Sequence, residues 1–253
     1  MDHENAFKQW KRHCFSKVDF SKKGNIDDEI YPVVCLINDS SNYFTTSSCS
    51  GRIILIDGLS ECSRVQKQNC SWLFVTHQKC KVADVVLGLQ KASGNAVFKF
   101  EPFVLHVQCK DIESAKLLHS VAVNSGFRNS GMSIGKRGKI IMAVRSTHCL
   151  EVPLSHKGEI LVNENYIHFL VQAANQKMAE NVTRIKRFYD GLQAVLQADG
   201  SSSMATCKDK TTKIVQNQHQ RKTQDSVIED SQIPANKFSD SEDYLETSLI
   251  LFS

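Results

Sequence analysis

A long run of regularly spaced apolar residues near the C-terminal end places the strongest limit on how this chain can fold. Ten apolar residues follow Asn163 at steps of three and four positions: Ile167, Leu170, Val171, Ala174, Met178, Val182, Ile185, Tyr189, Leu192 and Leu196. This spacing puts them on one face of an α-helix, and Asn163 is a suitable N-cap. A helix of this kind is stabilised mainly by packing, so we expect it to lie against a folded domain.

The residues before this helix alternate between strand-like and helical patterns. Helices are expected at 6–17, 27–38, 82–93 and 112–125, and strands at 43–48, 52–57, 71–77, 97–100, 103–109, 139–145, 150–152 and 159–162. The order is not a regular βαβ alternation, and no glycine-rich nucleotide fingerprint or phosphate loop is present. The sequence therefore predicts an α/β fold (α+β possible). We expect a single mixed-sheet domain with flanking helices and a long C-terminal helix, not a regular doubly wound nucleotide fold.

The composition changes after residue 198. The following stretch begins with glycine and serines, continues through KDKTTKIVQNQHQRKTQDS and becomes acidic at SDSEDYLE. It contains too few large apolar residues to offset the entropy of ordering the chain. We therefore expect a folded domain over residues 1–198 and a disordered tail over 199–253.

Charge and cysteine content exclude several classes of protein. The net charge is only +4, which by itself does not indicate a nucleic-acid partner. The nine cysteines form no Cys-x-x-Cys pair, so no metal site is predicted. An odd cysteine count, no apolar leader and no membrane-spanning stretch together predict a cytoplasmic protein.

Two polar clusters lie in and between the expected strands at 43–48, 52–57 and 71–77. The first is Ser47, Ser48, Cys49 and Ser50, followed by a glycine and Arg52. Small hydroxyl residues beside glycine allow close approach of a ligand, and arginine can bind a carboxylate or phosphate, although a polar turn has the same composition. The second cluster is Trp72 and His77. Their odd spacing puts them on opposite faces of a strand, so a core tryptophan and a strand-end histidine is the favoured interpretation. A nucleophilic Cys49 activated by His77 is a less favoured alternative, because many cysteines here resemble ordinary core residues.

The positive charge concentrates between Gly126 and Leu150, where no Asp or Glu occurs. Lys136, Arg137 and Lys139 stand among glycines, a composition that suits a phosphate backbone, and Phe127 offers a possible stacking face. A solvated hairpin is the alternative. At the end of this segment, His148 is suited to proton transfer near neutral pH, with Glu151 three residues later as a possible orienting group.

Five separated motifs resemble the tRNA wybutosine-synthesizing protein 3 family. They are FTTSSCSGRI (44–53), VQKQNCSWLFVTH (65–77), FKFEPFVLHVQC (98–109), NSGFRNSGMSIGKRGK (124–139) and AVRSTHCLEVPLSHKG (143–158), and NYIHFLVQAANQKM (165–178) fits as well. The chain departs from the family pattern at Cys149, where the family has glycine. If that glycine required a positive φ, cysteine would be strained there.

The resemblance implies an S-adenosylmethionine-dependent methyltransferase over residues 1–198. Its expected product carries a methyl group on N(4) of the 4-demethylwyosine intermediate at position 37 of tRNA-Phe. The anticodon loop of tRNA-Phe is the implied partner, and other enzymes of the same pathway are possible partners. No membrane partner is expected.

The resemblance also implies roles for particular residues. His148 and Glu151 are the expected catalytic pair, and Lys136, Arg137 and Lys139 the expected RNA contacts. The expected cofactor or substrate residues are Ser47, Ser48, Cys49, Ser50, Arg52, Trp72, His77, Arg128, Asn129, Ser130, Arg145 and Thr147. The alternative function is a non-catalytic RNA-binding module that assists another tRNA-modification enzyme.

Overall fold

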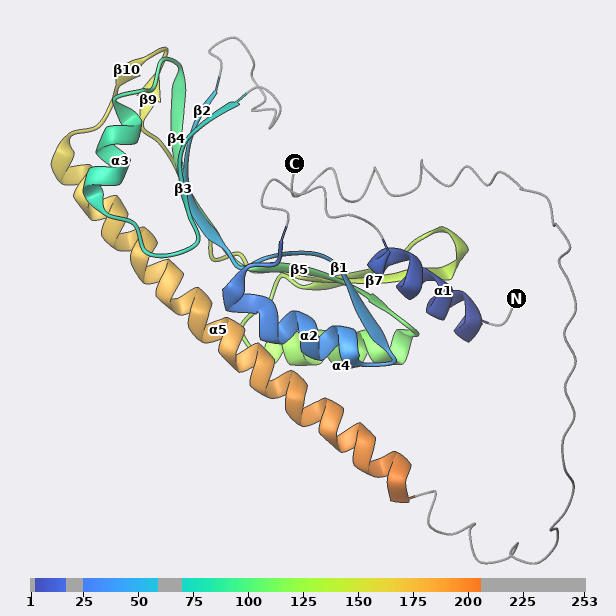
Figure 1. The fold of residues 1–253 in the computed structure, drawn as a ribbon. Helices are drawn as coiled ribbons and strands as arrows, with labels where there is room; N and C mark the ends of the chain where they lie inside the picture. Colours follow the sequence, from blue (N-terminus) through green and yellow to red (C-terminus); the bar gives the residue numbers. More distant parts are fainter. Residues whose placement is uncertain (1–2, 17–24, 59–69, 206–253) are drawn as a thin grey trace, which may run out of the picture. The chain divides into compact units, whose positions relative to one another are not determined.

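The strands form two four-stranded antiparallel sheets. The computed structural model describes residues 3–16, 25–58 and 70–205, with only the backbone at His3, at Lys136 and over 199–205. Within these residues the first sheet has the order β1-β5-β7-β6 and the second the order β3-β2-β4-β8, with a small β9-β10 ladder beside the second (Figure 1). Every strand pair is antiparallel.

The first sheet contains β1 (Tyr43–Cys49), β5 (Val104–Cys109), β7 (Ile140–Val144) and β6 (Gly131–Ile134). One of its faces forms a core with α2 (Tyr31–Asp39) and α4 (Ile112–Asn124), which includes Tyr43 and Val107. Side chains alternate along a strand, so Phe44 points to the opposite face. The helix α1 (His3–Phe15) packs on that face through Phe7, whose ring centroid lies 5.3 Å from that of Phe44.

The second sheet contains β3 (Cys70–Thr76), β2 (Arg52–Gly58), β4 (Asn95–Glu101) and β8 (Leu150–Pro153). Its core face carries Leu55 and Phe98, which pack against α3 (Val82–Leu89) and the first half of α5 (Glu164–Ala205). The short strands β9 (Ser155–His156) and β10 (Glu159–Ile160) follow β8.

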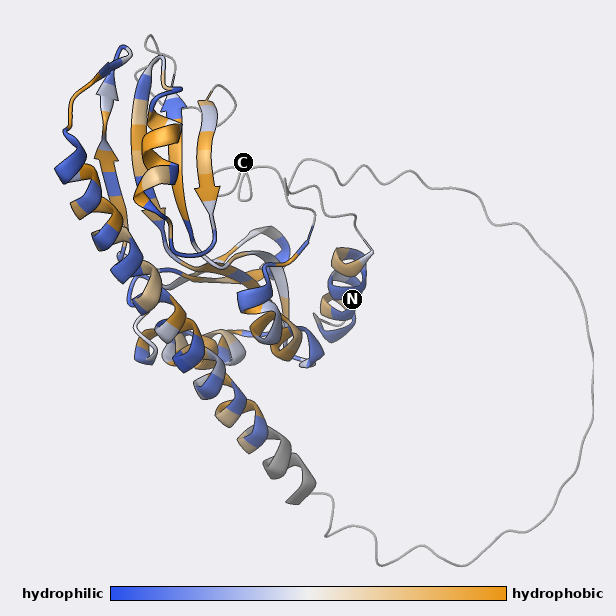
Figure 2. Cartoon of the chain, turned by 60° about the vertical axis from the view of Figure 1, so that its left-hand side comes forward, coloured by the Kyte–Doolittle hydropathy of each residue, from blue (hydrophilic) through white to orange (hydrophobic). Residues whose placement is uncertain are grey.

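The helix α5 packs against both cores. Ile167 to Met178 belong to the core of the second sheet, and Ile185, Phe188 and Leu192 to the core of the first. The banded colouring of this helix in Figure 2 reflects its amphipathic sequence. One expected position is wrong: Val182 is 51% exposed, and the polar Asn181, only 1% exposed, occupies the buried face.

Three connections carry the chain from one sheet to the other. They are Ser50–Gly51 between β1 and β2, Pro102–Phe103 between β4 and β5, and residues 145–149 between β7 and β8. Asn181 faces two of them, because its Nδ2 donates to the Ser50 carbonyl oxygen at 2.7 Å and its Oδ1 accepts from the Phe103 N–H at 2.8 Å. We call the region formed by these three connections the sheet junction.

The sequence prediction of an α and β fold with flanking helices and a long C-terminal helix is confirmed. The expected single mixed sheet is wrong in detail, because the strands separate into two antiparallel sheets. Four elements were not predicted from the sequence: the strands β6 and β9 and two 3-10 turns, η1 (Asp28–Ile30) and η2 (Lys136–Gly138). No helix of the described residues is long and apolar enough to cross a membrane.

Most of the expected tail lies outside the described residues, which end at 205. The helix α5 extends past the expected boundary at 198, as far as Ala205. Contacts divide the chain into one unit ending at Leu196 and a second beginning at Gln197. The disorder of the tail stays a prediction.

Candidate active site at the sheet junction

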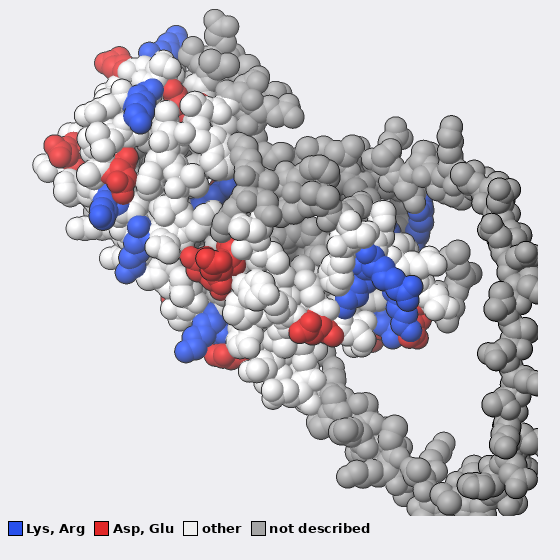
Figure 3. Space-filling view, in the orientation of Figure 1, with Lys and Arg blue, Asp and Glu red and all other residues white. Residues whose placement is uncertain are grey.

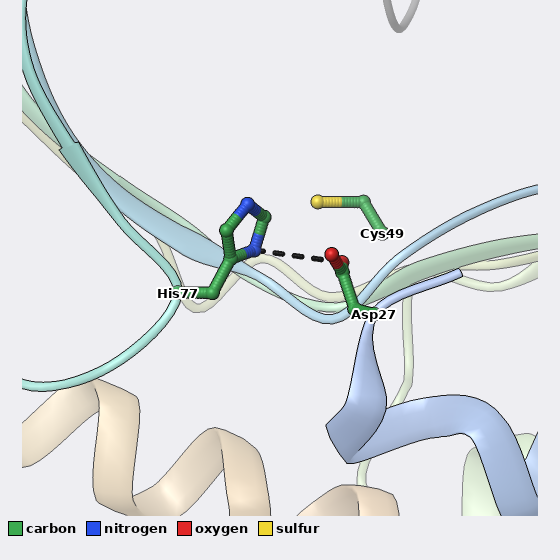
Figure 4. Close-up of side chains that lie close together, drawn as sticks. All are labelled: Asp27, Cys49 and His77. Atoms are coloured by element: carbon green, nitrogen blue, oxygen red, sulfur yellow. Dashed lines mark ion pairs between the residues drawn. The ribbon is translucent and has the colours of Figure 1, made fainter. Parts of the chain in front are cut away.

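Three side chains from distant parts of the sequence meet at the junction: Asp27, Cys49 and His77 (Figure 4). Asp27 precedes η1, Cys49 ends β1, and His77 follows the last residue of β3. A ligand-type atom of each lies within 4.8 Å of those of the other two. A group of this composition could bind a metal ion, so the expected absence of a metal stays a prediction.

The hydrogen bonds of His77 fix the position of one ring proton. Nδ1 lies 2.9 Å from the Gly51 carbonyl oxygen and 3.4 Å from Asp27 Oδ2. A carbonyl oxygen only accepts, so this contact requires a proton on Nδ1. The other ring nitrogen points away from Asp27 (Figure 4) and, in the neutral ring, carries a lone pair.

Asp27 holds this arrangement in place. Its Oδ2 also accepts the Ser50 backbone N–H at 2.8 Å, and the side chain is only 7% exposed. An aspartate in front of a helical turn commonly caps it, but Asp27 makes no capping bond with η1. The carboxylate is instead directed at Ser50 and His77.

Cys49 is a neutral thiol in this environment. Burial raises the pKa of Cys49, and the opposing backbone contact from Gly51 and charge of Arg52 are smaller effects. A cysteine nucleophile needs the opposite shift. The structure therefore gives no support to a Cys49–His77 hydrolase.

Arg52 has partners within the protein. Its Nε lies 2.7 Å from Glu101 Oε2 across the β2–β4 pair, and its guanidinium lies 4.9 Å from the centroid of the Trp72 ring. Arg52 and Trp72, both expected to bind a ligand, are thus brought together on one face of the second sheet. The ion pair with Glu101 satisfies part of the guanidinium.

A second polar cluster, Ser47–His106–Arg145, lies on the first sheet. Ser47 Oγ is 2.8 Å from His106 Nδ1, and Arg145 Nη2 is 3.2 Å from His106 Nε2. The register of β1 against β5 shifts between Thr45 and Ser47, and this bulge brings Ser47 opposite His106. Ser47 and Cys49 alternate onto the same face of β1, so the two clusters are neighbours.

His106 orients Ser47 as a hydrogen-bond donor. Burial, and secondly the Arg145 charge, lower the pKa of His106 to about 4, so its ring is neutral near pH 7. Arginine only donates, and therefore Nε2 accepts and Nδ1 carries the proton toward Ser47. The hydroxyl hydrogen of Ser47 is then available for a ligand.

His148 lacks the support that was expected for it. Its Nδ1 is buried and has no hydrogen-bond partner among the described residues, and its ring packs edge-on against Phe100 at 5.8 Å. Burial, followed by the charges of Lys177 and Arg184, lowers its pKa, while Glu180 has a smaller opposing effect. A ring held mainly by apolar packing is poorly oriented for proton transfer.

Glu151 has a different partner from the one expected. It lies on β8 opposite Lys99 of β4, and its Oε1 is 2.9 Å from Lys99 Nζ. The side chain is 62% exposed. No described contact joins Glu151 to His148, because the intervening turn separates the strand from the connection. Its catalytic role stays a prediction.

Cys149 carries no backbone strain. The only non-glycine residues with positive φ among those described are Arg137 and Lys157. A cysteine therefore fits this position without the penalty considered above. Thr147 and Cys149 are exposed on the connection, and Ser146 Oγ binds both the His148 N–H and Arg184.

The turn after α4 contains Arg128, Asn129 and Ser130. Arg128 and Asn129 are exposed, and Ser130 Oγ accepts the Arg145 N–H at 3.1 Å.

The hypothesis that Phe127 stacks on a base is wrong. Its ring is fully buried and packs against Phe103 and Phe188 in the core, because an aromatic residue after the C-terminal turn of a helix can close the core beneath it.

The expected RNA-binding residues lie at the tip of the β6–β7 hairpin. Arg137 is exposed with a φ of 64°, and Lys139 Nζ lies 5.1 Å from the centroid of the Trp10 ring in α1. This contact joins the hairpin to α1, which carries Lys8, Lys11 and Arg12. Lysine and arginine side chains gather over α1 in Figure 3. The structure thus places a second basic element beside the expected one.

Comparison with known proteins identifies the family. Residues 9–194 match the family described as "Methyltransferase TYW3". The chain belongs to the TYW3 methyltransferase family. This confirms the family to which the sequence motifs pointed.

Relatives and solved structures of the family resemble the chain over most of its length. The tRNA wybutosine-synthesizing protein 3 homolog of Danio rerio is 57% identical over 97% of this chain and 98% of its own. A Pyrococcus abyssi relative, 32% identical over 72% of this chain and 87% of its own, is named tRNA(Phe) 7-((3-amino-3-carboxypropyl)-4-demethylwyosine(37)-N(4))-methyltransferase 2. The PH1069 protein of Pyrococcus horikoshii superposes with a TM-score of 0.69 at 32% identity, covering 76% of this chain and 98% of that one.

A TYW3 methyltransferase requires a methyl donor, and the junction has unsatisfied donors and acceptors that fit one. Within the described part of the chain, Arg145 Nε and His148 Nδ1 are buried without a partner. An unpaired buried polar atom is costly unless a ligand or water satisfies it. A guanidinium typically binds a carboxylate through two nitrogens, and Ser47 offers a hydroxyl donor nearby.

Three residues of the junction in this TYW3 chain were not predicted from the sequence: Asp27, His106 and Asn181. Asp27 was interpreted as an acidic residue at a helix start, and His106 as part of a buried strand. Asn181 was passed over for the neighbouring Val182. The only sequence signal was at His106, a polar residue inside a largely apolar strand segment. Asp27 and Asn181 gave none.

Proposed function

We propose that this protein methylates N(4) of the 4-demethylwyosine intermediate at position 37 of tRNA-Phe, with S-adenosylmethionine as the donor. The observation that carries the proposal is the likeness to the Pyrococcus abyssi enzyme of that name over 87% of its length. The polar side chains gathered at the sheet junction support it. The cytoplasm stays the expected compartment, and other enzymes of the pathway stay possible partners.

The chain's own residues offer a way to hold the cofactor. Arg145 Nε, which is buried and has no partner among the described residues, would bind the carboxylate of the methionine portion, while the Ser47 hydroxyl would donate to a second acceptor. His106 supports both residues, because it accepts from Arg145 and donates to Ser47. Such preorganised donors lose little entropy when the ligand binds.

The substrate base is part of an anticodon loop and is therefore unpaired. Single-stranded bases are bound by stacking and by contacts to their exposed edges, and basic side chains bind the flanking phosphates. The Arg137 hairpin and α1 supply positive charge, and the Trp72 ring with its Arg52 partner supplies an aromatic group. These features suit RNA, although they do not by themselves require catalysis.

The enzyme contributes alignment and proton removal. S-adenosylmethionine, when bound, supplies a methyl group on a positively charged sulfur. The residues of the junction would hold the accepting nitrogen in line with that methyl group, exclude water and accept the nitrogen's proton. Alignment alone accounts for a large share of the acceleration in such reactions.

Two measurements test the proposal. Calorimetry with the full chain should detect S-adenosylmethionine binding, and an Arg145→Gln variant should bind it at least tenfold more weakly. The purified protein should also add one methyl group to tRNA-Phe that carries 4-demethylwyosine, as measured by mass spectrometry of the released nucleoside. If the protein binds this tRNA but does not bind the cofactor and does not methylate the substrate, it is instead a non-catalytic RNA-binding module.

A further inference from the structure

Two ion pairs lie side by side on the outer face of the second sheet, the face that is turned away from α3 and α5. Arg52 of β2 pairs with Glu101 of β4, and Lys99 of β4 pairs with Glu151 of β8. Residues directly opposite each other on neighbouring strands point to the same face, as do residues two apart on one strand. Positive and negative charges therefore alternate across three adjacent strands.

The cations of this face lie deeper than the carboxylates. The side chains of Arg52 and Lys99 are 14% and 17% exposed, whereas those of Glu101 and Glu151 are 41% and 62% exposed. An ammonium group has three N–H donors, and the described contact of Lys99 Nζ is with Glu151 Oε1 alone. No described contact involves Glu151 Oε2. The pair can therefore bind a further carboxylate at the lysine and a further ammonium group at the glutamate.

The Lys99–Glu151 pair lies a short distance from the sheet junction. Arg52 borders the junction, because it follows Gly51 in the chain, and its guanidinium lies 4.9 Å from the centroid of the Trp72 ring. Lys99 lies two residues further along β4 than the residue opposite Arg52, a separation of about 7 Å in an extended strand. A base held at Arg52 and Trp72 would thus have the pair within reach of a short substituent.

The base of the proposed reaction carries a substituent of matching charge. The name of the Pyrococcus abyssi relative includes a 3-amino-3-carboxypropyl group at position 7 of the base. This group ends in an α-amino acid centre, with an ammonium group and a carboxylate on one carbon near neutral pH. We propose that Lys99 binds this carboxylate and Glu151 this ammonium group, so that the pair selects the substrate that carries the side chain. The inference rests on the proposed function and names residues that select its substrate.

The methyl donor carries the same end group, because the methionine portion of S-adenosylmethionine is also an α-amino acid. The structure offers a cation for each of the two carboxylates. Arg145 follows β7 of the first sheet, and its Nε is buried without a partner among the described residues, whereas Lys99 and Glu151 belong to the second sheet. The more exposed pair suits a group that arrives on a large RNA. Cofactor affinity distinguishes the two sources.

The first test compares two forms of tRNA-Phe, one with the 3-amino-3-carboxypropyl group on 4-demethylwyosine and one without it. The measured quantity is kcat/KM for methyl transfer by the full chain. The parent should prefer the first tRNA about a hundredfold, since each charge-assisted contact contributes about tenfold or more. Lys99→Gln and Glu151→Gln should each lower this preference about tenfold, and the double variant should remove it. Lys99→Arg, which keeps the charge, should retain most of it.

A matched control shows whether the preference depends on this particular ion pair. Lys116 and Glu113 of α4 form a pair of the same residue types at 2.8 Å, away from the sheet junction. Lys116→Gln and Glu113→Gln should leave the preference within about twofold, and all these variants should fold, because exposed ion pairs add little stability. A structural role of Lys99, or a catalytic role of Glu151, would lower the rates on both tRNAs equally and leave their ratio unchanged.

The second test does not depend on turnover. Fluorescence anisotropy without cofactor should give the same preference between the two tRNAs. Acetylation of the amino group on the substrate removes its positive charge, so the parent and Lys99→Gln should bind the acetylated tRNA about tenfold more weakly than the untreated one. Glu151→Gln should bind both alike. By calorimetry, Lys99→Gln should bind S-adenosylmethionine within about twofold of the parent.

The outcomes separate the two proposals. If the parent methylates neither tRNA, the proposed function fails, and the binding measurements alone decide whether Lys99 and Glu151 hold the side chain. If an active parent does not distinguish the two tRNAs, or if Lys99→Gln lowers both rates equally, the pair does not select the substrate. A large loss of S-adenosylmethionine affinity in Lys99→Gln would assign the pair to the cofactor and overturn the inference.

Discussion

The side chain of Asn181 donates a 2.7 Å hydrogen bond to the carbonyl oxygen of Ser50, a residue 131 positions earlier in the chain. The same amide accepts the Phe103 N–H through its oxygen. One buried side chain on α5 therefore satisfies a backbone group in each of two connections between the sheets. The polar position on an otherwise apolar face sets how α5, β1 and β5 meet at the junction.

Replacing Asn181 with alanine should destabilise the fold and the site together. Two buried backbone groups would lose their partners, at a cost of about 2 to 5 kcal/mol in the free energy of unfolding. Urea denaturation and methyl transfer, measured on the folded fraction, check this. Asn175 provides a matched control, because it bonds the N–H and carbonyl of Cys80 away from the junction. Asn175→Ala should lower stability but leave the rate per folded molecule unchanged. Equal effects on the rate would contradict the special role of Asn181.

Gly51 should tolerate no side chain. Its φ is +100°, and a Cβ built there would lie 2.8 Å from Asn181 Nδ2 and 3.1 Å from the Glu101 carbonyl oxygen. Gly51→Ala should therefore cost about 2 to 4 kcal/mol in unfolding free energy. Gly131 in β6 is the control, because a Cβ there meets nothing within 4 Å and its φ is not positive. Gly131→Ala should change stability by no more than about 0.5 kcal/mol. The melting temperatures of the two variants, measured by thermal unfolding, check this. Equal melting temperatures would show that Gly51 is not required by its backbone conformation and close contacts.

Sequence patterns predicted most elements of this fold because the apolar residues recur with the periods of helices and strands. The pattern of α5 gave the right face except at position 182, where the apolar Val182 is exposed and Asn181 is buried. A period cannot identify a polar residue that is buried to satisfy distant backbone groups. Nor can it divide strands between two sheets, since the turns at Ser50–Gly51 and Pro102–Phe103 read like ordinary hairpin and loop connections.

Part of the candidate site could also be predicted from the sequence. Cys49, Ser50 and His77 were expected as ligand-binding residues, and they do meet at the junction. Asp27 was not predicted to join them, because its contact with His77 spans 50 positions and depends on the tertiary fold. The support for His148 by Glu151 was inferred from a three-residue spacing, whereas the strand register pairs Glu151 with Lys99.

Truncation after residue 198 should leave the domain folded. Among the residues of α5 whose side chains the structure describes, which end at 198, Leu192 is the last fully buried one, and Val195 and Leu196 are the last that pack against the core. Removing the following residues should lower the melting temperature by only about 2 °C or less, since little described apolar surface is lost. Differential scanning calorimetry of the truncated and full-length chains checks this. A much larger decrease would show that the region after 198 contributes to the core.

Neutralising Lys136, Arg137 and Lys139 together should weaken tRNA binding and reduce its salt dependence. Each lost phosphate contact removes the release of counterions from the RNA. The magnitude of the slope of the logarithm of the tRNA-binding constant against the logarithm of the salt concentration should therefore decrease by about one per contact. Cofactor affinity should barely change. The exposed Lys79, Lys81 and Lys91 flank α3 and form a control set of equal charge. If both triple variants bind tRNA with the same slope, the hairpin is not part of the RNA surface. Circular dichroism should accompany the measurement, because Lys139 also contacts Trp10.

His106 should make the fold less stable in mild acid. Its pKa is about 4 in the folded protein, against about 6.5 for an unperturbed histidine. Above pH 6.5 the ring is neutral in both states and stability is unaffected. Between pH 6.5 and 4 the unfolded chain binds a proton that the folded chain does not, so stability decreases as pH falls. The decrease should reach about 2 kcal/mol at pH 5 and level off below pH 4.

A His106→Gln variant isolates this contribution. Glutamine can still accept from Arg145 and donate to Ser47, but it does not titrate. Urea denaturation of the parent and the variant at pH 8 and pH 5 gives the difference in unfolding free energy at each pH, and effects of the other histidines cancel between the two proteins. The parent should lose about 2 kcal/mol more than the variant on going to pH 5. If the unfolding free energies of parent and variant change in parallel with pH, His106 takes up its proton in the folded protein as readily as in the unfolded chain. The assignment of a neutral His106 ring that directs the Ser47 hydroxyl toward a ligand would then be wrong.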